Sequence, residues 1–300
     1  MADLADSTGA PAVAAGAPVR LHVRAMAHGG EGIADAPDGR VVFVRGAIPG
    51  DTVEATLTKA KKRRARAAAT AGLDPSPHRV DPTCPAAAAG AGCCDFSHIA
   101  AHAQLEFKRE VLLGQLGALS SRSGVLDGYD LHEVEAIQLE PVTGWRTRVR
   151  LGVDRKGNAG MRRARSAEVV AGVQCTQPKA GLLDGIVGEG AATFTPGAEL
   201  VVAVDAKGTR HVVETRAAQR GRRVERVEHV LEGPGELVEH VRGFAFVFPP
   251  TAFWQAHQRA PEAYSDVIYQ WGAGAYANCV GWDLYGGVGA FVPAMSAALG

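Results

Sequence analysis

Alternation of apolar and polar residues near the start of the 300-residue chain is the feature that most restricts its fold. Val19, Leu21 and Val23 alternate with arginine and histidine, which predicts a strand with one basic face. Strand-like runs follow at Arg40–Val44 and Thr52–Leu57, separated by glycine turns. Short strands this close together favour a small closed barrel, because closure leaves no exposed strand edge.

The residues after the barrel predict a second, mainly antiparallel β region. A turn-rich stretch, Asp74–Asp95, is followed by an amphipathic helix at Leu105–Leu119. Arg146–Val153 has the alternation of a strand and breaks at the sequence Asp154–Asn158, which favours a hairpin turn. Three further strand-like runs follow: Leu200–Val204, His211–Thr215 and Glu236–Val247.

The last part of the chain has the pattern with which a doubly wound α/β domain begins. A helix is predicted at Pro261–Ala273, then an apolar strand, a glycine-rich turn and a helix at Ala290–Leu299. A parallel sheet cannot consist of one strand with an uncovered face, so we expect this domain to be incomplete.

The expected fold class is therefore α+β and multidomain, with a β-barrel, an antiparallel β domain and the start of an α/β domain. Four divisions are predicted: a disordered leader at residues 1–17, a barrel at 18–73, a cysteine-bearing β domain at 74–245 and the incomplete α/β domain at 246–300.

Composition restricts the class of protein further. The chain has 32 basic and 32 acidic residues, so any affinity for nucleic acid must come from local patches. No run reaches the roughly 18 apolar residues of a membrane helix, and the first residues lack a secretion signal. We expect a cytoplasmic monomer. Its 5 cysteines are an odd number, which favours a metal or cluster site over a disulfide framework.

The glycine turn Asp283–Gly289 is a candidate cofactor loop. Glycines there let a ligand approach the backbone and let the helix pack near the strand. Val292 occupies the place of the third glycine of the dinucleotide fingerprint, which weakens a nicotinamide interpretation. An acidic residue followed by G-x-G suits a class I methyltransferase better. The alternative is an ordinary tight turn.

Four motifs, in this order along the chain, carry a resemblance to a known family. They are the barrel turns Gly29–Gly32 and Pro49–Asp51, the cysteine segment Cys84–His98, Phe253–His257, and the glycine turn. Over roughly residues 18–300 the chain resembles the TRAM-domain uracil-C5 RNA methyltransferases, which act on rRNA or tRNA.

The resemblance implies a cofactor, S-adenosylmethionine, and residues that contact it. Gln255 and Tyr285 match family residues that bind S-adenosylmethionine, and Asp283, Gly287 and Gly289 belong to the same loop. Gly286 replaces the cysteine usual in that loop, and we expect it to be tolerated. Ala290 stands where relatives often have Asn or Thr. The barrel is implied to be an OB-like RNA-binding unit.

In the family, a cysteine thiolate adds to uracil C6 so that C5 can attack the methyl group, and a base then removes the C5 proton. Access requires a flipped or single-stranded uridine. Both residues lie well beyond the glycine loop, so we expect no catalytic residue in this chain and no methyl transfer by it alone. The alternative is a stand-alone RNA-binding protein without methyltransferase activity. A radical methylthiotransferase is disfavoured, because its C-x3-C-x2-C triplet does not occur.

Many members of the family hold a [4Fe–4S] cluster. By resemblance, Cys84 matches its first ligand, Cys94 its third and Cys175 its fourth, whereas Ala91 occupies the second position and Cys93 abuts Cys94. Adjacent cysteines would need a strained backbone to bind one cluster. Zinc, or no metal at all, remain alternatives. We expect Cys279 to be a core residue of the strand before the glycine turn.

Two groups of basic residues are candidate RNA contacts. Lys61, Lys62, Arg63 and Arg64 end the barrel, where a basic groove would bind phosphates. Arg146 and Arg148 lie on one strand face with Arg150. The alternatives are a solvated charged face and ion pairs with carboxylates across the sheet. We expect Phe253 and Trp254 both to fill a domain interface rather than to stack on bases.

Overall fold

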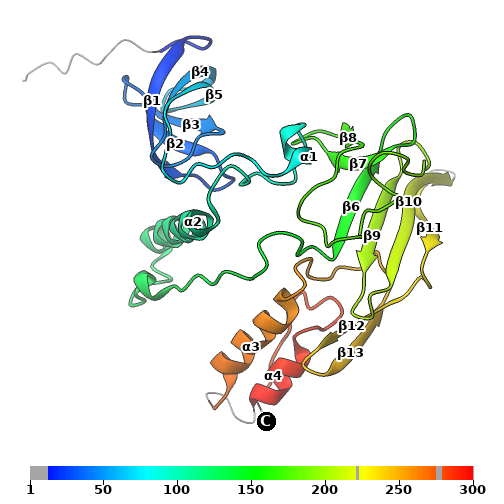
Figure 1. Cartoon of the computed structure of the whole chain (residues 1–300). Coiled ribbons are helices and arrows are strands. Elements are labelled where there is room, and N and C mark those ends of the chain that lie inside the picture. The colour runs from blue at the N-terminus through cyan, green and yellow to red at the C-terminus, as the bar shows by residue number, and fades with distance from the viewer. Residues whose placement is uncertain (1–12, 221–222, 275–278, 300) are drawn as a thin grey trace, which may run out of the picture. The chain divides into compact units, whose positions relative to one another are not determined.

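The computed structural model describes residues 13–220, 223–274 and 279–299, so most of the expected leader lies outside the described residues. Contacts divide the chain into two compact units. The first contains the residues up to Pro82 together with Asp95–Gln138, and the second contains Thr83–Cys94 together with Leu139–Gly300. Figure 1 shows the elements of each unit.

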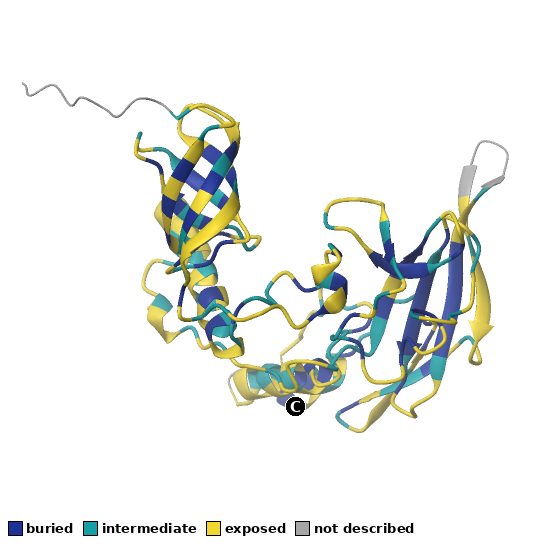
Figure 2. Ribbon diagram, turned by 45° about the horizontal axis from the view of Figure 1, so that its top comes forward, coloured by how far each residue is buried: buried dark blue, intermediate teal, exposed yellow. Residues whose placement is uncertain are grey.

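A closed five-stranded barrel forms the first unit, as the sequence predicts. The alternating residues of its strands point in turn to the interior and to solvent, which gives the chequered burial of Figure 2. Its interior holds small and branched side chains, among them Leu21, Val23 and Val42. In the order β1-β2-β3-β5-β4, the strands are β1 Pro18–Met26, β2 Gly32–Asp35, β3 Val41–Arg45, β5 Arg64–Asp74 and β4 Thr52–Ala60.

The sequence pattern predicts three of the five barrel strands and misses β2 and β5. Five of the 11 residues of β5 are alanine, which has low strand propensity, and the apolar–polar alternation stops after Ala67. Pairing fixes it instead, because β5 lies between β3 and β4 and hydrogen-bonds to both.

The predicted long helix is present as α2, Ala101–Ser123, which ends at Gly124 with a left-handed backbone. Its apolar face covers one end of the barrel, where Phe107 and Ala103 pack with Met26 and Ile48. Two short helical turns, α1 Pro85–Ala88 and η1 Leu131–Glu133, lie on either side of it in the sequence.

A six-stranded sheet forms the larger part of the second unit, and each of its strand pairs is antiparallel, as predicted. Leu151, Leu200 and Val202 from its central strands are buried in one core with apolar residues of the cysteine segment. In the order of the sheet, the strands are β11 Arg223–Glu232, β10 Arg210–Arg220, β9 Glu199–Val204, β6 Arg148–Val153, β7 Ala159–Arg162 and β8 Val169–Ala171.

The remaining elements are a hairpin and two helices. They are β12 Leu237–Val241, β13 Phe244–Phe248, α3 Ala260–Gly272 and α4 Val292–Leu299. The expected strand before the glycine turn is wrong, because Cys279–Asp283 forms no strand. Cys279 is exposed and is not a core residue. A parallel strand needs partners to satisfy its backbone, and no described strand pairs with this segment.

The contacts divide the chain differently from the predicted boundaries at residues 74 and 246. Helix α2 belongs with the barrel, and the last two helices belong with the six-stranded sheet. Among the described residues, no helix is long and apolar enough to cross a membrane.

Asp51, in the turn between β3 and β4, holds the barrel to the segment that follows it. The carboxylate is buried and accepts hydrogen bonds from the backbone N–H groups of Ile48 (2.8 Å) and Ser76 (2.9 Å). Arg79 donates to both carboxylate oxygens. Burial alone would raise the pKa of Asp51, but the hydrogen bonds from Arg79, Ser76 and Ile48 outweigh it, so that the pKa is lowered.

We predict that Asp51→Asn lowers the free energy of unfolding at pH 7 by about 2–3 kcal/mol, because Arg79 loses its buried ionic partner. The lowered pKa means that the ionised carboxylate stabilises the fold above the unfolded-state pKa of about 3.9. This stabilisation is lost as the pH falls through the folded-state pKa. Chemical denaturation between pH 7 and pH 3 measures both effects.

The matched control is Asp35→Asn, which removes an exposed ion pair with Arg24 (2.8 Å). That variant is expected to change stability by less than about 1 kcal/mol. Equal effects of the two substitutions would contradict the role assigned to Asp51.

Candidate functional site

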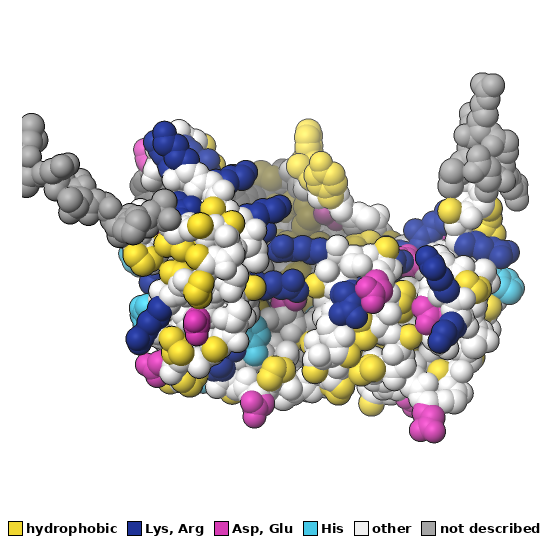
Figure 3. All heavy atoms as spheres, turned by 90° about the horizontal axis from the view of Figure 1, so that it is seen from above, with side chains coloured by type: hydrophobic (Ala, Val, Ile, Leu, Met, Phe, Trp, Pro, Cys, Tyr) yellow, Lys and Arg dark blue, Asp and Glu magenta, His cyan; other side chains and the backbone are white. Residues whose placement is uncertain are grey.

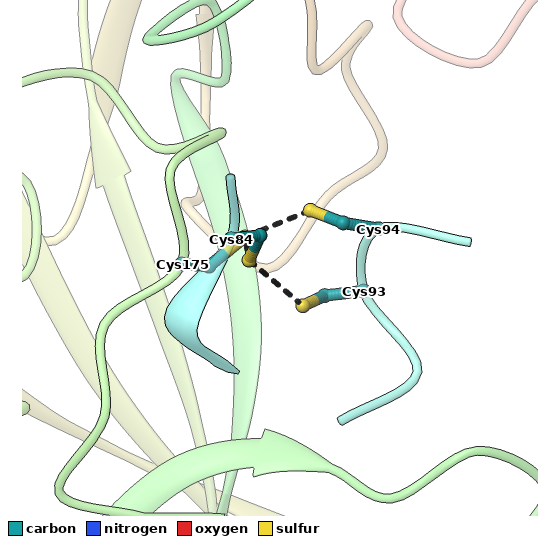
Figure 4. A group of neighbouring side chains, drawn as sticks. All are labelled: Cys84, Cys93, Cys94 and Cys175. Carbon is teal, nitrogen blue, oxygen red and sulfur yellow. Dashed lines mark hydrogen bonds between the residues drawn. The ribbon is translucent and has the colours of Figure 1, made fainter. Parts of the chain in front are cut away.

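Four cysteines from two separate stretches of the second unit meet in space (Figure 4). Cys84 precedes α1, Cys93 and Cys94 follow it, and Cys175 lies in the loop after β8. The four sulfur atoms all lie within 4.8 Å of one another. The three contacts between them measure 3.8 Å from Cys84 to Cys93, 3.7 Å from Cys84 to Cys175 and 3.4 Å from Cys94 to Cys175.

The environment of the sulfurs favours thiolate at Cys175. Hydrogen bonds from Cys93 and Cys94 lower the pKa of the Cys175 thiol, and the backbone N–H of Gln177 also donates to its sulfur (3.5 Å). Thiolate is the form of cysteine that binds metals. Neither Cys93 nor Cys94 has a positive φ.

The arrangement does not fit the [4Fe–4S] cluster that the resemblance implies. Such a cluster binds each cysteine through a different iron at the corner of a cube, which separates the sulfurs by roughly 6 Å. The sulfurs here lie closer together than that. Ala91, at the position of the second cluster ligand, is buried and supplies no donor.

A pocket of about 610 Å³ opens beside the cysteines. Cys93 and Cys175 form part of its wall, so the sulfur group and the pocket share residues. Four arginines and one carboxylate also line the pocket: Arg146, Arg148, Arg150, Arg162 and Glu199. Its volume is in the range of pockets that hold small ligands.

Glu199 pairs with arginines from three different strands. Its carboxylate lies 2.7 Å from Arg150, 3.7 Å from Arg162 and 3.1 Å from Arg226. Ion pairing across the sheet was the alternative to an RNA-facing surface, and Arg150 forms such a pair with Glu199. The pocket is lined by four arginines and one carboxylate, so its lining has an excess of positive charge.

The other two arginines of the pocket are held differently. The Arg148 guanidinium donates to the carbonyl oxygens of Ala252 (2.9 Å) and Pro250 (3.4 Å) and thereby fixes the segment on the opposite wall. Arg146 lies over the Trp145 ring, at 4.7 Å from its centroid, and Trp145 in turn stacks on His257 at 5.2 Å. Arg146 and Arg148 both line the pocket, and their contact with RNA stays a prediction.

Phe253 and Trp254 have opposite environments. Trp254 is buried and packs on Phe248 and Phe246, as expected of an interface residue. The same expectation is wrong for Phe253, which is 73% exposed and lines the pocket. Alternation along an extended segment places the two neighbouring side chains on opposite sides.

One apolar cluster brings the glycine turn next to the segment that carries Gln255. Trp254 and Ala290 are buried in this cluster with residues of β12 and β13, and Val288 packs against it. Gln255 follows Trp254 directly and is half-buried. The two segments that the resemblance assigns to S-adenosylmethionine are therefore neighbours, although about thirty residues separate them in the sequence.

The glycine turn has the backbone and polar groups of a ligand loop. Tyr285, Gly287 and Gly289 have positive φ values of 62°, 59° and 79°, and the Tyr285 side chain is fully exposed. One carboxylate oxygen of Asp283 is buried without a hydrogen-bond partner among the described residues. A Cβ atom at Gly286 would lie 2.4 Å from that oxygen, so glycine at this position leaves room for the Asp283 side chain.

The basic run of the barrel lies at the turn from β4 to β5. Lys61, Lys62, Arg63 and Arg64 are all exposed. Arg66 on the same strand pairs with Glu31 (3.2 Å) and is less free. Figure 3 shows dark blue Lys and Arg side chains gathered on the surface that the barrel forms.

Several residues of the site were not found from the sequence. Glu199, Thr251 and Gln177 line the pocket but carry no local motif. Trp145 next to Arg146, with His257 in the Phe253–His257 motif, was the available signal for the aromatic stack.

Comparisons with known proteins agree with this architecture. The TRAM domain family model matches residues 15–70, which span β1 to β4 and most of β5. The chain is 48% identical to an RNA methyltransferase of Corynebacterium efficiens over 308 aligned positions, which cover 100% of this chain and 72% of the relative. A 23S rRNA uracil-C5 methyltransferase of Marinomonas is 36% identical over 158 positions, covering 52% of this chain and 33% of the relative.

A solved structure has the same fold. It is the tRNA (uracil-54, C5)-methyltransferase of Pyrococcus abyssi in complex with S-adenosyl-L-homocysteine, with a TM-score of 0.59 and 17% identity, covering 91% of this chain and 69% of that one.

The TRAM match to the barrel and the near-complete match to an RNA methyltransferase place the chain in a class of RNA-modifying proteins. The chain belongs to the TRAM-domain RNA methyltransferases, since the whole of this chain aligns with the Corynebacterium relative at 48% identity.

Glu239 on β12 makes the stability of the second unit depend on pH. Burial raises the pKa of Glu239 to about 7, and Asp205 adds to this while Arg148 opposes it. Burial also lowers the pKa of Arg148 to about 10, which leaves the guanidinium charged at neutral pH.

We predict that Glu239→Gln stabilises the protein at pH 8 by about 1–2 kcal/mol. The folded chain binds the Glu239 proton more tightly than the unfolded chain, so stability falls as the pH rises from about 4 to about 7. The amide cannot ionise, and the variant escapes this loss. Denaturation at pH 5 and pH 8 measures the difference.

The control is Glu236→Gln, an exposed carboxylate on the same hairpin, which should change stability by less than about 0.5 kcal/mol at either pH. A Glu239→Gln variant with the pH dependence of the unmodified chain would contradict the assignment.

Proposed function

We propose that the chain acts in the methylation of uridine C5 in RNA, with S-adenosylmethionine as the methyl donor. The observation that carries the proposal is the position of the segment Pro250–Ala256. This segment lines the arginine pocket on one side, and through Trp254 it packs with the glycine turn on the other. A pocket for RNA and a loop for the donor are thus joined by the same residues.

The chemistry of the pocket suits a nucleotide. Its arginines provide positive charge for a phosphate, and the exposed Phe253 ring provides a surface for stacking. An RNA methyltransferase must take its base out of the stack, and a pocket of this size accommodates an extruded nucleotide.

S-adenosylmethionine, when bound, supplies the methyl group on its sulfonium. We propose that Gln255, Asp283 and Tyr285 hold the cofactor, with Gly287 and Gly289 allowing close backbone approach. The buried, unpartnered oxygen of Asp283 supports a polar ligand at this turn.

The similarity to 23S rRNA enzymes at the level of sequence favours rRNA over tRNA as the substrate. Nucleoside mass spectrometry of rRNA and tRNA from cells lacking the gene tests both parts of the proposal. We expect one 5-methyluridine to disappear from rRNA. An unchanged content of 5-methyluridine in both RNA classes would overturn the proposed function.

The sequence-based expectation that these 300 residues do not methylate RNA by themselves stays a prediction. Incubation of the purified chain with rRNA and radiolabelled S-adenosylmethionine tests it. Incorporation of label into 5-methyluridine would contradict it.

We predict that the triple variant Lys61→Ala, Lys62→Ala, Arg63→Ala binds single-stranded RNA about tenfold more weakly at low salt. Three lost phosphate contacts should also reduce the slope of log affinity against log salt by about 2. Fluorescence anisotropy over a salt series measures both values.

The control is the double variant Arg155→Ala, Lys156→Ala, which removes exposed charges from the β6–β7 turn of the other unit. If the control weakens binding as much as the barrel variant, the basic run is not a specific RNA surface.

We predict that Gln255→Ala lowers the affinity for S-adenosylmethionine by about tenfold, the value of one well-placed hydrogen bond. Gln258→Ala, three residues along and exposed, should leave the affinity unchanged. Equilibrium dialysis with radiolabelled cofactor compares the two. Equal affinities would remove Gln255 from the binding site.

A further inference from the structure

We propose that Cys84, Cys93, Cys94 and Cys175 bind a single divalent metal ion of the zinc class, in tetrahedral thiolate coordination, in place of an iron–sulfur cluster. The proposal concerns the metal alone and does not depend on the uridine methylation proposed above.

The sulfur positions match one ion. Thiolates bind zinc at about 2.3 Å, and the corners of a tetrahedron of that radius lie about 3.8 Å apart. The three sulfur contacts of 3.4, 3.7 and 3.8 Å agree with this edge, and the remaining pairs lie within 4.8 Å. Coordination by one ion therefore requires only small shifts of the side chains.

The sequence of the site points the same way. Cys93 and Cys94 are neighbours, so their Cα atoms lie only about 3.8 Å apart. Two such thiolates reach adjacent corners of one coordination sphere more readily than two different irons of a cluster. Ala91, buried at the place where the cluster ligand would be, cannot compensate. Figure 4 shows the Cys93 and Cys94 side chains both directed toward Cys84 and Cys175.

The ion would cross-link the cysteine segment to the loop after β8 in the second unit. The cysteine segment Thr83–Cys94 belongs to this unit, although the residues that follow it belong to the barrel unit. Its backbone is attached to β7 by the hydrogen bond from the Gly92 N–H to the Arg162 carbonyl (2.9 Å). A metal bound to Cys175 as well would cross-link positions 81 and more residues apart in sequence, which restricts the unfolded chain strongly.

The ion would also fix the positions of residues in the wall of the arginine pocket. Cys93, Cys175 and Gln177 all line it, and the Gln177 N–H donates to the Cys175 sulfur. Hydrogen bonds of this kind orient a metal-bound thiolate. The metal site is thus structural and adjoins the pocket.

The test is metal and sulfide analysis of the full chain, purified without oxygen from cells supplied with both iron and zinc. We expect one zinc ion per chain, with neither iron nor acid-labile sulfide above trace level. Exchange with Co²⁺ should give the visible absorption bands of tetrahedral cobalt thiolate. Removal of the metal by a chelator should lower the melting temperature.

Cys93→Ser should weaken zinc binding by at least about a hundredfold, measured by competition with a coloured chelator. Cys279→Ser is the matched control, since Cys279 is exposed and lies outside the group, and it should bind zinc like the unmodified chain.

About four iron and four sulfide ions per chain would overturn the proposal in favour of a cluster. A chain that takes up no metal, even when Zn²⁺ or Co²⁺ is added, would overturn it in favour of a purely apolar role for the cysteines. Both measurements of metal content use the unmodified chain, so they test the proposal even if Cys93→Ser does not fold.

Discussion

Burial of Trp254 is the contact on which the arrangement of the hairpin, the Pro250–Ala256 segment and the glycine turn depends. Its indole packs on Phe248 and Phe246 of the β12–β13 hairpin, in the same cluster as Ala290 of the glycine turn. A large aromatic side chain supplies more apolar area than any other residue type, so it can hold three segments together where each is too short to form a core. The exposure of Phe253 and the position of Gln255 both follow from that anchor, because their backbone is fixed by it.

Charge is distributed unevenly over the second unit. The chain has no net charge, yet four arginines line the pocket and one carboxylate, that of Glu199, lies among them. At physiological salt, exposed charges act over only about 8 Å, so the local excess matters for RNA and the zero total does not. In the barrel, Asp51 and Arg79 use the same kinds of groups for a different purpose, since their pair is largely buried and serves to join segments.

Local pattern was enough to predict the elements whose residues alternate or repeat with helical period. Strands β1 and β6 were predicted because their apolar residues alternate, and β9 and β10 because apolar runs mark strands that are buried on both faces. Strand β5 was not predictable, since its alanines become a strand only between β3 and β4. The strand expected before the glycine turn failed for the converse reason: its residues have the right pattern, but no described strand pairs with it. Pairing partners, which a local window does not contain, decided both cases.

The candidate site was also predictable from the sequence only in part. The cysteine group was predictable as a set, because the resemblance names a family with cysteine-bound clusters and the cysteines are odd in number. Which metal depends on distances between sulfurs, and these are set by how far the loop after β8 approaches the cysteine segment. Ala91 stands at the second ligand position, and Cys93, next to Cys94, brings its sulfur within 4.8 Å of the other three. That spacing suits the corners of one tetrahedron better than the corners of a cube. Metal identity in such a site is therefore a property of the spacing of the thiolates more than of their number.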